Sequence, residues 1–95
     1  MNLFQLSLGN YPINESNEKD LSKFMKDNSI VRGVKKEIKI PVSPGVFLHL
    51  TVLFNKTMST FSILKKMFYI YKNGKASFTD DFSQLQMIID QLSQD

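Results

Sequence analysis

The stretch VFLHLTVLF, Val46 to Phe54, constrains the fold more than any other part of the chain. Successive side chains of a β-strand point to opposite faces of its sheet. Here every second residue from 46 to 54 is Val, Leu or Phe, and the other series also contains Phe47 and Leu53. A strand that is apolar on both faces is typical of an interior strand. The stretch therefore predicts an interior strand that is covered on both sides.

A second strand is expected just before it, in IVRGVKKEIKIPV, residues 30–42. Ser43-Pro44-Gly45 supplies residue types that favour a tight connection between the two strands. Pro41 has no N–H to donate, so this strand is expected to lie at an edge of the sheet.

Three further elements follow from local patterns. The alternation in NLFQLSL, residues 2–8, predicts a first strand, which GNYP, residues 9–12, should end. Apolar residues recur with helical spacing in residues 16–28, and acidic residues lie in the first turn of that segment. Residues 79–93 show the same features and predict a last helix.

The stretch FSILKKMFYIYKNGK, Phe61 to Lys75, is ambiguous. Asn73-Gly74 is a strong hairpin signal, and the aromatic residues before it favour a strand. Neither of the two alternating series is clean, however, because each mixes lysine with large apolar side chains. At a helical pitch, the apolar residues gather on one half of the circumference, and Gly74 falls where a C-terminal cap belongs. The pattern therefore favours a helix over residues 61–72.

These elements predict one α+β domain over residues 1–95, in the order β-α-β-β-α-α. The expected sheet has three strands, is mainly antiparallel, and is packed with helices.

Catalytic and metal-binding chemistry finds little support in the sequence. The chain has no cysteine, and His49 is its single histidine, so a transition-metal site is not expected. The four glycines are too scattered to cradle a phosphate. We therefore expect a protein that is not an enzyme and that needs no cofactor or metal. No apolar run approaches the ~20 residues that cross a bilayer, and no signal segment is evident, so the expected location is cytoplasmic without membrane contact.

Charge is distributed unevenly along the chain. Residues 31–75 contain nine basic residues and one acidic residue, whereas residues 76–95 contain four aspartates and no basic residue. On the expected helix, Lys65, Lys66, Tyr69 and Lys72 share the polar face, and Lys75 lies just beyond it. Arg32, Lys35 and Lys39 extend this surface if the strand before Pro44 lies beside the helix. Basic clusters of this kind are footprints for phosphates or for acidic proteins.

Two functions remain open. The first is a small non-enzymatic protein that binds another cytoplasmic protein with an acidic surface, as an inhibitor or adaptor of the kind that phages and mobile elements often encode. The second is a nucleic-acid-binding protein with weak sequence specificity, since lysine binds phosphate as a point charge. The net charge of only +3 and the acidic last segment favour the first. Association with a second copy of the chain is compatible with either function.

Overall fold

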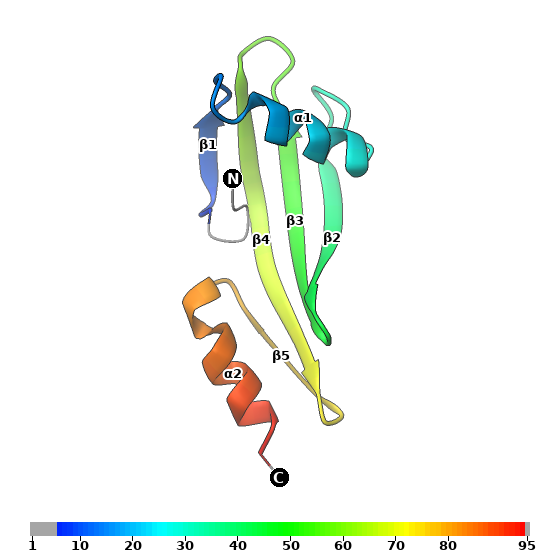
Figure 1. Cartoon of the computed structure of the whole chain (residues 1–95), viewed down its shortest axis with the longest axis vertical. Coiled ribbons are helices and arrows are strands. Elements are labelled where there is room, and N and C mark those ends of the chain that lie inside the picture. Colours follow the sequence, from blue (N-terminus) through cyan, green and yellow to red (C-terminus); the bar gives the residue numbers. More distant parts are fainter. Residues whose placement is uncertain (1–5, 95) are drawn as a thin grey trace.

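The computed structural model describes residues 6–94, which form a single antiparallel sheet with two helices (Figure 1). The elements are β1 (Gly9–Pro12), α1 (Glu18–Asp27), β2 (Lys36–Ser43), β3 (Val46–Phe54), β4 (Thr60–Lys72), β5 (Lys75–Thr79), the 3-10 turn η2 (Phe82–Gln84) and α2 (Leu85–Leu92). The α+β class is as predicted. The described chain has five strands rather than three, however, and its order is β-α-β-β-β-β-α.

β4 is the longest strand and organises the sheet. β3 pairs with it along one edge, and β2 lies beyond β3 as the edge strand that Pro41 predicts. On the other edge of β4 two short strands follow each other, because β1 pairs with Thr60–Ile63 and β5 pairs with Phe68–Lys72. Figure 1 shows β1 and β5 at opposite ends of β4.

The prediction of a helix over residues 61–72 is wrong, because this segment forms β4. Thr51 of β3 faces Lys65, while the next residue, Val52, faces Ile63, so Leu64 is an extra residue in a β-bulge. Before the bulge the buried side chains have odd numbers, and after it they have even numbers. This shift of one residue breaks the alternation in the sequence and lets the segment resemble an amphipathic helix.

The Asn73-Gly74 hairpin signal was correct. Asn73 has φ of 55° and Gly74 has φ of 71°, and Lys72 pairs directly with Lys75 across this two-residue turn. Positive φ at both central residues is the conformation of a type I′ turn, which matches the twist of antiparallel strands. The turn joins β4 to β5, which the sequence patterns did not predict.

The first strand also differs from its prediction. Residues 6–8 are not in a strand, residues 2–5 lie outside the described part of the chain, and β1 begins at Gly9. GNYP, expected to end a strand, is therefore the strand itself. Its pairing with β4 decides this, because the ring of Tyr11 stacks on that of Phe61 with centroids 5.2 Å apart.

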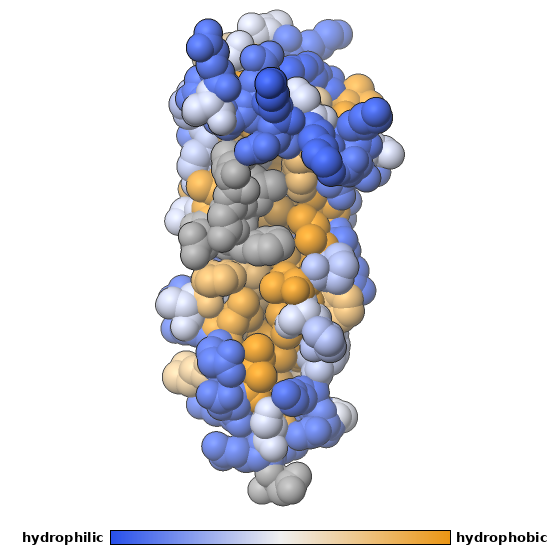
Figure 2. All heavy atoms as spheres, in the orientation of Figure 1, coloured by the Kyte–Doolittle hydropathy of each residue, from blue (hydrophilic) through white to orange (hydrophobic). Residues whose placement is uncertain are grey.

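The hydrophobic core lies between the sheet and the two helices. Leu48, Phe54 and Phe68 are completely buried on one face of the sheet. α1 contributes Leu21 to the same cluster, and α2 contributes Leu85 and Ile88. In Figure 1, α1 crosses the sheet near one end, and α2 lies beside β5 near the other end. Between them, apolar residues reach the surface in Figure 2.

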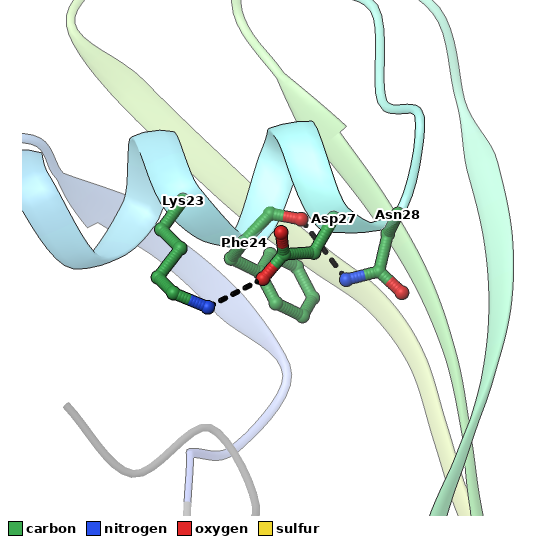
Figure 3. A network of polar contacts seen from close by, with 4 residues as sticks. All are labelled: Lys23, Phe24, Asp27 and Asn28. Atoms are coloured by element: carbon green, nitrogen blue, oxygen red, sulfur yellow. Dashed lines mark hydrogen bonds and ion pairs between the residues drawn. The ribbon is translucent and has the colours of Figure 1, made fainter.

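The C-terminal end of α1 is held by local polar contacts (Figure 3). Lys23 Nζ lies 2.7 Å from Asp27 Oδ2, one turn away, and Asn28 Nδ2 donates to the carbonyl oxygen of Phe24 at 2.9 Å. The same carbonyl oxygen also accepts the backbone N–H of Asn28 at 3.1 Å, so Asn28 caps this end of the helix with both its backbone and its side chain. The exposed ion pair adds little stability by itself.

The second face of β3 corrects another expectation. β3 is interior within the sheet, as predicted, but both helices pack on the same side, and the side chains of Phe47, His49, Thr51 and Leu53 are only partly buried. The strand is thus covered on one face. Its other face is apolar without a covering layer in the described chain.

Candidate functional site: the open face of the sheet

We call the side of the sheet opposite α1 and α2 the open face. Strand pairing places side chains on it in rows, because residues that are paired across antiparallel strands point to the same side. Its central residues are Glu37 and Lys39 of β2, Phe47, His49, Thr51 and Leu53 of β3, Lys65, Met67, Tyr69 and Tyr71 of β4, and Phe78 of β5.

Aromatic rings form two neighbouring groups on the open face. The Tyr69 ring lies 4.4 Å from the His49 ring and 6.4 Å from the Phe78 ring, and Phe47 meets Tyr71 edge-on at 6.1 Å. Phe78 is 65% exposed and Tyr71 is 51% exposed. Large exposed rings that gather in one place are characteristic of interaction surfaces.

Two lysines flank these rings. Lys39 Nζ lies 4.4 Å from the centroid of the Phe47 ring, a cation–π contact. Lys65 is exposed two strands away. Together with His49 and Tyr69 the two lysines line a hollow of about 220 Å³. Within residues 6–94, neither Lys39 nor Lys65 forms an ion pair, so their charges are available to an anionic partner.

His49 is one of the residues that line this hollow, and its ring packs against that of Tyr69. Its Nε2 atom is buried and has no hydrogen-bond partner within the described chain.

The structure brings together only part of the predicted basic surface. Lys39, Lys65 and Tyr69 share the open face, although Tyr69 is half-buried rather than exposed. Lys66 points to the opposite face and is buried there, because β4 is a strand and adjacent residues alternate. The prediction that Lys65, Lys66 and Tyr69 share one helical face is therefore wrong.

The remaining predicted residues lie at the two ends of the molecule. Lys72 and Lys75 flank the β4–β5 turn. Arg32 and Lys35 lie in the loop before β2, which is attached at the other end of the sheet by a hydrogen bond from the Gly33 N–H to the carbonyl oxygen of Phe54. With a longest dimension of 51 Å, the molecule keeps these two pairs well apart.

The sequence patterns missed Phe47, Tyr71 and Phe78 as surface residues. Phe47 was assigned to a covered face of β3, and Tyr71 to the buried side of a helix. The one available signal was the apolar character of the second face of β3, which indicates either a covering layer or a binding surface.

Comparison with known proteins gives no family. No protein-family model matches this chain, and no curated protein or solved structure is significantly similar to it. Within the described residues, no three His, Asp or Glu side chains lie close enough to hold a metal ion. No helix in that same range is long and apolar enough to cross a membrane.

Proposed function

We propose that this chain is a non-enzymatic binding protein whose open face engages another protein, as an inhibitor or adaptor. The observation that supports this is the group of exposed rings, Tyr71 and Phe78, flanked by Lys39 and Lys65 on a face that neither helix covers. An apolar centre with a charged rim is the usual composition of a protein–protein interface.

The two most exposed rings could supply much of the binding energy. A Tyr or Phe side chain presents about 200 Å² of surface when fully accessible. With Tyr71 51% exposed and Phe78 65% exposed, they offer on the order of 200 Å² in total. At about 25 cal/mol per Å², burial of this area is worth roughly 5 kcal/mol before the costs of association.

The lysines contribute in a different way. Exposed charges at the rim of an interface mainly accelerate association and select partners of opposite charge. The partner surface is therefore acidic around an apolar patch.

The test is capture of a partner from lysate by variants of the open face and by matched controls. Phe78→Ala and the pair Lys39→Glu, Lys65→Glu should abolish capture. Met87→Ala, which removes an apolar side chain exposed to 52% on α2, and the pair Lys19→Glu, Lys26→Glu on α1 should retain it. Capture that is insensitive to the open-face variants, or equally sensitive to the controls, would contradict the proposal.

Single-stranded nucleic acid is a second candidate partner, favoured by the rings of β3 and β4 that lie beside Lys39 of β2 and Lys65 of β4. Proteins that bind single strands often stack bases on aromatic side chains of an open sheet, with basic residues along the backbone. Loss of capture after nuclease treatment would favour this partner. Binding of a labelled single strand at ~50 mM salt should then fall steeply as salt rises, and Tyr71→Ala should weaken it.

A further inference from the structure

The outer edge of β4 contains a gap. β1 pairs with its first four residues and β5 with its last five, so residues 64–67 face no strand on that side within the described chain. Unpaired N–H and C=O groups along such an edge are able to bond to a ligand that carries amide groups.

A hollow of about 570 Å³ lies at this gap. Its size is in the range of sites that bind small molecules. It is lined by Ser7 and Leu8 before β1, by Lys66 of β4, and by Asp80, Asp81, Phe82 and Ser83 after β5.

Lys66 brings a buried positive charge to this hollow. Its side chain is 8% exposed, and its Nζ atom donates to the carbonyl oxygen of Leu6 at 2.9 Å and lies 5.3 Å from the Phe68 ring centroid. An ammonium group has three N–H donors, and within residues 6–94 only this one hydrogen bond forms. A buried charge with unused donors is costly unless something else satisfies it.

Two carboxylates stand on the other side of the same hollow. Burial lowers the pKa of Lys66, and the negative charges of Asp80 and Asp81 partly raise it again. Neither forms an ion pair with Lys66 among the described residues. Asp81 already accepts hydrogen bonds from the N–H and hydroxyl of Ser83, which leaves Asp80 as the carboxylate without a described hydrogen bond.

We propose that this hollow binds a zwitterion of the amino-acid or short-peptide class. The carboxylate of the ligand bonds to Lys66 Nζ, its ammonium group lies against Asp80 and Asp81, and its amide groups pair with the backbone edge at residues 64–67, which no described strand occupies. A simple anion would be repelled by the aspartates and a simple cation by Lys66, whereas a zwitterion satisfies both ends. This site is on the helix side of the sheet and is independent of the function proposed for the open face.

The test is an NMR titration of the whole chain with the dipeptide L-alanyl-L-alanine. Saturable shifts are expected at residues 64–67 and 80–83. The N-acetylated dipeptide lacks the ammonium group and the dipeptide amide lacks the carboxylate, and each should bind about tenfold more weakly, as expected for loss of one charge-assisted bond. Absence of saturable shifts, or equal binding of the capped compounds, would overturn the proposal.

Three variants locate the contacts. Asp80→Asn is a change at an exposed position that should fold normally, and it should reduce the preference for the dipeptide over its N-acetylated form, because only Asp81 then faces the ammonium group. Lys66→Met should remove the preference for the free carboxylate, whereas Lys65→Met, at the neighbouring position on the open face, should bind like the parent protein. Should Lys66→Met fail to fold, Asp80→Asn decides: an unchanged preference for the free ammonium group in that variant refutes the site.

Discussion

Phe68→Ala and Leu64→Ala together test whether residues 60–72 form a bulged strand. In a helix, positions four residues apart share a face, so the two substitutions would cost similar amounts. In the structure, Phe68 is 0% exposed, and its ring lies 5.9 Å from the Phe82 ring. Leu64 is the bulged residue and is 43% exposed. The strand therefore predicts very different costs for the two.

The magnitudes follow from burial. Truncation of a fully buried Phe to Ala typically costs about 3–5 kcal/mol, because a cavity is left behind. Leu64 is only about half-buried and leaves no enclosed cavity, so its truncation should cost about 1 kcal/mol. At a urea slope of roughly 1.5 kcal/mol per M, the two unfolding midpoints should differ by about 2 M.

Urea unfolding followed by circular dichroism measures both midpoints. If Phe68→Ala is too unstable to study, Phe68→Leu retains most of the buried volume and should cost about 1–2 kcal/mol. Equal destabilisation by Leu64→Ala and Phe68→Ala would refute the bulged strand and the packing described here.

Three other changes to the chain, two substitutions and one deletion, probe separate features. Burial lowers the pKa of Lys66 in the folded chain below its usual 10.5. Between the folded and unfolded pKa values the unfolded chain binds more protons, so the free energy of unfolding rises with pH across that alkaline window. In thermal melts, Lys66→Met should be more stable at pH 7 than the parent protein and should lack this rise. Gly45→Ala would place a Cβ 2.3 Å from the carbonyl oxygen of Tyr71. It should cost several times the ~1 kcal/mol expected for Gly74→Ala, where φ is positive but the space is open. Similar urea midpoints for the two variants would contradict this expectation. Deletion of Leu64 should preserve the fold, because the residues on either side then alternate regularly, and a collapsed amide NMR spectrum would count against it.

The sequence predicted the elements whose patterns are local and regular. β3 alternates without interruption, α1 has apolar residues at helical spacing, and Pro41 indicated an edge strand correctly. The pattern does not predict β4, because Leu64 inserts one residue into its alternation and the interrupted pattern resembles a helix that ends at Asn73-Gly74.

Other features depend on tertiary contacts that no local pattern records. β1 consists of residues that usually form turns, and it is a strand because β4 offers it an edge. Lys65 and Tyr69 were expected on one helix face, with Lys39 on a neighbouring strand; the structure places these three residues on one face, but as residues of the sheet. The sequence pattern does not show that Lys65 and Lys66 lie on opposite faces of the sheet, because the face on which each of two adjacent residues lies depends on the secondary structure.

The pairing of β1 with β4 has a consequence for the order in which the chain assembles. β2, β3, β4 and β5 are joined to one another by successive hairpins, whereas Asn10 of β1 bonds to Ser62, 52 positions later. Closing a loop of that length costs about 3.5 kcal/mol in entropy before any contact is gained, so we expect β1 to dock last and its amides to exchange with solvent first. Ser7 and Leu8 precede β1, so the hollow at Lys66 is completed only in this final step. A ligand there would slow the departure of the first strand.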